Sequence, residues 1–370
     1  MRPVRLLLFI FIILDSCVDK FNLNLPQSDQ LLVVDGMITD EPGPYTVKLQ
    51  WSSSSDELIP SAQYISGAQV IIKDSLGGAE TLTEVGYGNY QTSPNGIQGE
   101  PGKTYHVEIK TPDGKTFSSI PEKLQSAGAI DSLYFEFEQK VAIANGVPVP
   151  ANGFNIYING SVPANQKYLK WNWTGTYEVY THPELVTVPN TGMPGLPSFL
   201  AAPLPCSGYI TSDYVTIQQV DMCMCCRCWY NKSQEAPILS NSQLIVNNRF
   251  NEMNVAFIPA TARFFYQKYH FEIQQLSTTE TTYNFWKLVL AQINGSSSLF
   301  QPPIAKINGN VLGQNTNDRA LGIFSVCGVK RKVIWIYRSD IPYNFDDEIL
   351  KDDCRTLGVN ATTSQPVFWN

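Results

Sequence analysis

The sequence predicts a mainly β protein, with an N-terminal immunoglobulin-like β-sandwich followed by a larger β-rich domain that carries one main α-helix. Three observations predict this architecture. Short runs of alternating apolar and polar residues, separated by Gly- and Pro-containing turns, fill residues 30–126. Strand-like runs of the same kind recur across residues 127–370. A helical repeat of apolar side chains is convincing only at about residues 278–293.

The N-terminal region shows the alternation most clearly. In the segment KTYHVEIKTPDGKTFSS, the side chains of Tyr105, Val107 and Ile109 alternate with polar ones before a Pro-Asp-Gly turn. Two similar runs surround an earlier Asp-Glu-Pro-Gly-Pro turn. Short strands and turns at this spacing, over a region of this length, are typical of one immunoglobulin-like domain.

The larger region combines strands with a long excursion and the helix. Residues 181–220 are rich in Pro and Gly and show no period, which is typical of a functional or disordered loop. We expect the helix to begin at an S-x-x-E capping box made by Ser277 and Glu280, and to end after Asn294 at Gly295. Its expected apolar face consists of Tyr283, Trp286, Leu290 and Ile293.

The N-terminus resembles an export signal followed by a lipid-attachment site. Two arginines precede a run of nine apolar residues, which is too short to cross a bilayer because a spanning helix needs about 20. Residues 1–16 therefore predict a secretory signal peptide. Residues 14–17 resemble a bacterial lipobox, which predicts that Cys17 carries lipid and that residues 17–29 form a tether. An ordinary signal peptide with a chance cysteine is the alternative.

The composition limits the class of partner. The 370 residues are enough for two or more domains, and the 43% hydrophobic content is enough for a packed core. The net charge of −7 and the absence of a basic run argue against binding to nucleic acid. Charged residues make up only 16% of the chain, and a surface poor in charge suits contact with a carbohydrate, a peptide or another protein.

Six cysteines are candidates for disulfide bonds. An exported chain meets an oxidising compartment, so the cluster CMCCRCW is expected to form disulfides. Structural zinc and a thioredoxin-like redox site remain alternatives, although the cysteines are more crowded than zinc sites favour. Cys327 lies in an apolar strand and is expected to stay free, like other lone buried cysteines. The six candidates are Cys206, Cys223, Cys225, Cys226, Cys228 and Cys354.

No catalytic motif is recognisable, so the chain is expected not to be an enzyme and to hold neither a cofactor nor a metal. His106 and His270 lie in strand-like runs, and His182 begins the long excursion. The acidic residues at 346–348 and 352–353 fit a solvated face better than a calcium site, because no EF-hand spacing is present. A pair of carboxylates is enough for glycosidase chemistry, so the sequence leaves that activity open.

Several segments resemble one family of Bacteroidetes outer-membrane lipoproteins known as a domain of unknown function. They include LLVVDGMITDEPGPYTVKLQ, SGAQVIIKD, CMCCRCW, NEMNVAFIPA, STTETTYNFWKLVL and the ending CRTLGVNATTSQPVFWN. Members of the family that this chain resembles are encoded beside SusC-like TonB-dependent transporters. The resemblance therefore implies a lipid-anchored outer-membrane protein, exposed at the cell surface, that partners such a transporter. It carries no established catalytic residues to transfer.

Together these features predict a non-enzymatic accessory or binding subunit of a SusC-like TonB-dependent transporter, with a role in nutrient capture or uptake. A glycan or a peptide is the expected ligand. The aromatic residues Trp171, Trp173, Tyr177 and Tyr180, beside the long excursion, are the candidate contact surface, because aromatic side chains anchor interfaces well. The alternative for them is the sandwich core. The alternative functions are a structural or assembly factor of the envelope machinery and, less favoured, a hydrolase of glycan or peptide.

Overall fold

The structure is a computed structural model that describes residues 30–52, 63–144, 146–164, 166–240, 244–295, 307, 309–315 and 318–369. The predicted signal peptide, the lipidation site Cys17 and the tether lie outside these residues. Among the helices of the described part of the chain, none is both long enough and apolar enough to span a bilayer.

The first body is a two-sheet sandwich. One sheet has the order β1-β2-β7-β6, and the facing sheet has the order β9-β8-β4-β5, which is the strand arrangement of an immunoglobulin-like domain. Buried side chains such as Val34, Val47 and Val107 fill the space between the sheets. The strands are β1 (Leu32–Thr39), β2 (Thr46–Trp51), β3 (Gln63–Tyr64), β4 (Gln69–Asp74), β5 (Ala79–Thr81), β6 (Thr83–Gly86), β7 (Asn89–Gln91), β8 (Thr104–Lys110), β9 (Thr116–Ser119) and β10 (Glu122–Lys123).

Two late strands complete this first sandwich. β25 (Ala320–Cys327) runs parallel to β1, and β24 (Val311–Gly313) pairs antiparallel with β9. Ile323, Phe324 and Val326 of β25 are buried, so this strand contributes to the first core. The division that the sequence predicts between residues 126 and 127 does not anticipate this return, because alternation identifies a strand without identifying its partner.

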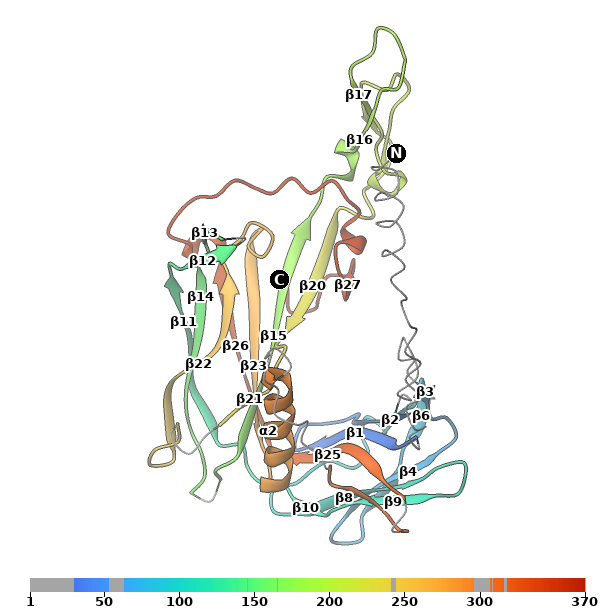
Figure 1. Ribbon diagram of the computed structural model, residues 1–370, viewed down its shortest axis with the longest axis vertical. Helices are drawn as coiled ribbons and strands as arrows, with labels where there is room; N and C mark the ends of the chain where they lie inside the picture. Colours follow the sequence, from blue (N-terminus) through green and yellow to red (C-terminus); the bar gives the residue numbers. More distant parts are fainter. Residues whose placement is uncertain are drawn as a thin grey trace, which may run out of the picture.

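The second body is a sandwich of two sheets (Figure 1). Its core is rich in aromatic rings. A three-stranded sheet, β11-β14-β22, faces a larger sheet with the order β26-β23-β15-β20-β27, to which β21 is added beside β15. The ring of Phe154 lies at the centre and contacts the rings of Phe135, Phe137 and Phe265. The strands are β11 (Ala129–Glu138), β14 (Gly153–Ser161), β15 (Leu169–Tyr180), β20 (Arg227–Ser233), β21 (Ile238–Leu239), β22 (Arg249–Pro259), β23 (Lys268–Ser277), β26 (Val329–Tyr337) and β27 (Ala361–Thr362).

Together the two sandwiches confirm the mainly β prediction with its single main helix. An additional hairpin, β12 (Val141–Ala144) and β13 (Val147–Pro150), stands at the end of the second sandwich that is remote from the first (Figure 1).

The helix α2 (Glu280–Gly295) agrees with the predicted range of about 278–293 to within two residues at each end, and Gly295 is its last residue, where the sequence predicts the helix to end. The predicted capping box is wrong, because the hydroxyl of Thr279 accepts the backbone N–H of Thr282. The Ser277 hydroxyl instead donates to the carbonyl of Gln125 and accepts the N–H of Gly328. Ser277 therefore ties β23 to neighbouring segments, and the helix starts only after that connection is made.

The two sandwiches are joined by buried and half-buried polar contacts. The guanidinium of Arg331 on β26 contacts Glu41 of the first sandwich and Glu272 of β23. The buried carboxylate of Glu122 on β10 accepts hydrogen bonds from Thr282 of α2 and from the Asn310 amide. These contacts fix the second sandwich on the first. The first sandwich lies at the end of the molecule opposite residues 181–226 (Figure 1).

Candidate docking site on a cystine-stapled arm

The long excursion is an ordered arm, defined here as residues 181–226, that leaves β15 and returns at β20. Figure 1 shows that it projects beyond the end of the second sandwich that is remote from the first. Its elements are the 3₁₀ turn η2 (Pro183–Leu185), the hairpin β16 (Thr187–Pro189) and β17 (Phe199–Ala201), the 3₁₀ turn η3 (Pro205–Ser207), and the hairpin β18 (Tyr209–Ile210) and β19 (Gln218–Gln219). The sequence predicts a functional or disordered loop at residues 181–220, whereas the structure shows that this segment is ordered into two hairpins.

Side-chain hydrogen bonds hold the two loops of the arm. The Asn190 amide donates to the carbonyls of Met193 and Pro197, while its oxygen accepts the backbone N–H of Met193. The Asp213 carboxylate accepts the Thr216 hydroxyl and the backbone N–H groups of Val215 and Thr216. These bonds, led by the Thr216 hydroxyl, hold the pKa of Asp213 well below its usual value. Both loops are therefore held by local Asn and Asp bonding.

Disulfide bonds secure the base of the arm. Within the arm, Cys206 pairs with Cys225 and Cys223 pairs with Cys226. In addition, Cys228 of β20 pairs with Cys354, which fastens the C-terminal region to the same place. The prediction that the CMCCRCW cluster forms disulfides is confirmed, and the structure supplies the connectivity that sequence spacing leaves open.

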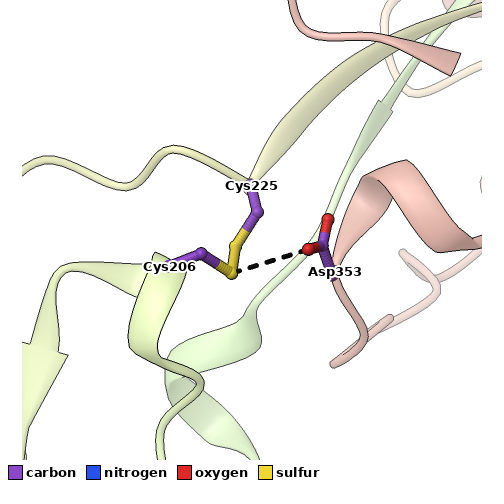
Figure 2. A group of neighbouring side chains, drawn as sticks. All are labelled: Cys206, Cys225 and Asp353. Carbon is purple, nitrogen blue, oxygen red and sulfur yellow. Dashed lines mark hydrogen bonds between the residues drawn. A yellow bond between two sulfur atoms is a disulfide. The ribbon is translucent and has the colours of Figure 1, made fainter.

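The metal alternative does not fit this geometry. Cys206, Cys225 and Asp353 are the one group in the described residues with potential ligand atoms gathered closely enough for a cation. Figure 2 shows that the two sulfurs are bonded to each other, so neither is a thiolate. The Asp353 carboxylate approaches the Cys206 sulfur to 3.8 Å, but it binds Arg355, whose hydrogen bonds lower the pKa of Asp353. This group is a cystine beside an ion pair.

The remaining described cysteine, Cys327, is a free and fully buried thiol in β25. Burial raises its pKa to about 12. A thiol with such a pKa stays protonated near neutral pH and is a poor nucleophile, so Cys327 behaves as a small apolar core residue.

Apolar side chains are unusually exposed on the arm. Met222 is 79% exposed and Phe199 is 62% exposed, whereas large apolar residues on a soluble surface are normally scattered singly. Three of the exposed residues are methionines, whose flexible side chains adapt to irregular partner surfaces. The set consists of Leu185, Val188, Met193, Phe199, Ile210, Tyr214, Val215, Val220, Met222 and Met224.

The arm also lacks cationic side chains. Between Lys170 and Arg227 the sequence contains no Lys or Arg, and the charged residues of the arm are Glu184, Asp213 and Asp221. Anionic lipid surfaces and nucleic acids attract clusters of Lys and Arg. An apolar, weakly acidic projection fits a protein surface better than either of those partners.

The predicted aromatic contact surface is wrong for three of its four residues. Trp171, Trp173 and Tyr177 are buried in the core of the second sandwich, because their shared spacing places them on the inner face of β15. Tyr180 lies on the outer face at the base of the arm, where its ring stacks on Tyr266 at 5.5 Å. The exposed apolar residues of the arm were missed because they follow no period.

A small cavity lies beside the base of the arm. It has a volume of about 110 Å³ and is lined by Tyr180, Tyr266 and polar side chains such as His182 and Arg263. The His182 ring nitrogen Nδ1 lies 2.9 Å from the carboxylate of Glu184. The predicted solvated role of the acidic run at 346–348 agrees with its exposed side chains, of which Asp347 pairs with Arg338.

Comparison with known proteins identifies the family. Residues 18–333 match the family described as Domain of unknown function (DUF4249), and the chain belongs to that family. None of the curated proteins matches the chain, and none of the solved structures does. The fold and the arm must therefore be interpreted from this chain's own residues.

Proposed function

We propose that this DUF4249 member is a non-enzymatic outer-membrane lipoprotein that serves as the accessory or binding subunit of a SusC-like TonB-dependent transporter. In this proposal Cys17 carries the lipid anchor and the cell surface is the site of action. The transporter is the macromolecular partner, and nutrient capture or uptake is the role.

The observation that carries the proposal is the arm itself. A projection with ten exposed apolar residues and no Lys or Arg is unfavourable in water unless a partner covers it. Its base is fixed by two internal disulfides and by the bond between Cys228 and Cys354. A fixed apolar projection loses little conformational entropy when it docks, which favours stable binding to one protein surface.

The test is a mild-detergent pull-down of the tagged full chain from native membranes, with partners identified by mass spectrometry. The arm variant replaces Phe199, Met222 and Met224 by Ser, which leaves the hairpins and the disulfides in place. The matched control replaces Leu76, Val85 and Leu312 by Ser, which are similarly exposed apolar residues of the first sandwich.

We expect a stoichiometric TonB-dependent transporter with the wild-type chain and the control, and loss of at least half of it with the arm variant. Equal recovery with the arm variant would contradict the docking role of the arm. Recovery of a barrel-assembly component in place of a transporter would favour the alternative role in envelope assembly, and the transporter proposal would then fail.

A further inference from the structure

The outer face of the larger sheet in the second sandwich carries three side chains that are unusually buried for a sheet surface, those of Glu178, Trp229 and His270. Strand register places Glu178 of β15 opposite Trp229 of β20, and His270 of β23 opposite Trp335 of β26. The same register, continued by one residue, places Lys268 beside Glu178. These five residues define the outer-face groove. Their neighbours along each strand, such as Tyr177 and Tyr269, point into the core.

A segment of the chain packs on three of these five residues, His270, Trp335 and Lys268. The C-terminal strap, defined as residues 363–369, follows β27 and returns across the sheet. The Phe368 ring stacks on His270 at 4.2 Å, and the Trp369 ring lies 5.3 Å from that of Trp335. The Lys268 ammonium lies over the Trp335 and Trp369 rings and reaches the Trp369 carbonyl. The side chains of Phe368 and Trp369 thus hold the strap against the sheet.

The rest of the strap is held weakly. Residues 363–365 are exposed, and Val367 is 92% exposed. A segment with few buried apolar contacts belongs to the least stable part of a fold and opens readily. The strap can therefore be displaced from the sheet more easily than a well-packed strand, because Phe368 and Trp369 hold it at one end and the rest of its length is loosely packed.

On β20 and β15, the strands between the start of the strap at β27 and its ring contacts on β23 and β26, a buried donor and a buried acceptor are left without partners. Glu178 is 2% exposed, and its Oε1 binds Arg227, but its Oε2 has no hydrogen-bond partner in the described part of the chain. Trp229 is 3% exposed, and its indole N–H likewise lacks an acceptor among the described residues. Buried polar groups are normally hydrogen-bonded, because leaving them unpaired is unfavourable. The two groups belong to directly opposed residues of β15 and β20.

This pair matches the hydrogen-bonding capacity of one residue of an extended peptide. The backbone N–H and C=O of such a residue point to the same side, so the Glu178 carboxylate can accept the N–H and the Trp229 indole can donate to the carbonyl oxygen. The neighbouring surface already accommodates the Phe and Trp rings of the strap. The groove thus combines aromatic contacts that are in use with amide-type hydrogen bonds that are not.

We propose that the outer-face groove is a binding site for an extended peptide segment carrying an aromatic side chain, and that the C-terminal strap occupies it until such a segment displaces it. The incoming segment places its rings on His270 and Trp335, as the strap does, and pairs the backbone N–H and C=O of one extended residue with Glu178 and Trp229. This site is separate from the arm, and it does not depend on the proposed transporter role.

The first experiment measures fluorescence anisotropy of a labelled octapeptide, TSQPVFWN, which copies residues 363–370 and can shift along the groove because it is untethered. The full-length wild-type chain is compared with the full-length double variant Phe368→Ala/Trp369→Ala, whose own strap has lost its anchors. We expect the double variant to bind the octapeptide at least about tenfold more tightly, because the tethered strap competes at high effective concentration. The peptide TSQPVAAN is the control and should not bind.

The second experiment tests the amide pairing. Adding Trp229→Phe to the double variant keeps an aromatic ring, smaller than the indole, but removes the donor, and should weaken octapeptide binding about three- to tenfold. Trp286→Phe on α2 is the matched control and should leave binding unchanged. An unaltered affinity with Trp229→Phe would overturn the amide pairing, and equal binding of TSQPVFWN and TSQPVAAN by the double variant would overturn the groove.

A third measurement keeps the proposal falsifiable if the double variant fails to fold. Excess octapeptide added to the wild-type chain should accelerate amide hydrogen exchange within residues 363–369, and TSQPVAAN should not. Unchanged exchange at saturating octapeptide would overturn displacement of the strap. A wild-type chain that sediments as a dimer, with a monomeric double variant, would overturn the proposal by assigning the groove to the strap of a second copy.

Discussion

The three disulfides should differ widely in their contribution to stability, and the structure gives the order. The bond between Cys228 and Cys354 spans a sequence separation of 126 residues, whereas the bond from Cys206 to Cys225 spans 19. A cross-link stabilises mainly by reducing the freedom of the unfolded chain, and this effect grows with the logarithm of the loop length. Removal of the long-range bond should therefore have the largest effect.

The magnitudes follow from loop-closure entropy. It predicts a loss in the free energy of unfolding of about 5 kcal/mol for the bond between Cys228 and Cys354 and about 3 kcal/mol for the bond between Cys206 and Cys225. For the bond from Cys223 to Cys226, which spans a separation of 3 residues, the same relation predicts about 1.5 kcal/mol. In a domain of roughly 200 residues, about 5 kcal/mol corresponds to a fall in Tm of roughly 10–20 °C.

The assay is urea unfolding, followed by tryptophan fluorescence, of three double Cys→Ala variants. Ala is preferred to Ser because Cys225, Cys228 and Cys354 are buried, and a buried hydroxyl would need a hydrogen-bond partner. Cys327→Ala serves as the control for loss of a buried sulfur without loss of a cross-link. If the short-range pair at 223 and 226 proves as stabilising as the long-range pair, the loop-length reasoning is refuted.

Three further outcomes are expected. Burial raises the pKa of Glu122, so the contribution of this residue to stability is present below its unfolded-state pKa and is lost as pH rises through its folded-state pKa. Glu122→Gln should therefore flatten the pH dependence of the free energy of unfolding, measured by urea unfolding from pH 4 to 8. The exposed control Glu100→Gln should leave that dependence unchanged. Phe154→Ala should lower the free energy of unfolding by about 3–5 kcal/mol in the same assay, and a loss below about 1 kcal/mol would contradict its central place in the core. Cys327 should resist iodoacetamide at pH 8 in the native chain and react in urea, as read by peptide mass, because burial raises the pKa of its thiol to about 12.

Local pattern was sufficient to predict the fold class but not the pairing of distant strands. Alternation identified the strands of the first sandwich, because one face of each strand is buried and the other is solvated. The same alternation could not show that β25 lies parallel to β1, since most strands of both sandwiches lie between them in the sequence. Prediction of that pairing needs knowledge of which edge strands remain open after the local hairpins form.

The candidate site, too, could be predicted from the sequence only in part. The cysteines could be assigned to disulfides from the expected oxidising compartment, but their pairing depends on how the arm folds back on its base. Trp171 and Trp173 were misplaced although the signal was present in the sequence. The residues between them and beside them, Lys170, Asn172 and Thr174, are polar, and that alternation indicates that the tryptophans face a core.

The arm and the outer-face groove present opposite physical problems to a partner. The arm is ordered by disulfides and by the Asn190 and Asp213 loops, so docking requires little further ordering and its apolar residues supply the driving force. Phe368 and Trp369 of the strap already occupy the aromatic part of the groove, so a peptide must first compete with them for that surface. Only a segment that also satisfies Glu178 and Trp229 gains hydrogen bonds that the strap does not make. Affinity at the arm should therefore depend mainly on exposed apolar area, whereas selectivity at the groove should depend on the unpaired acceptor of Glu178 and the unpaired donor of Trp229.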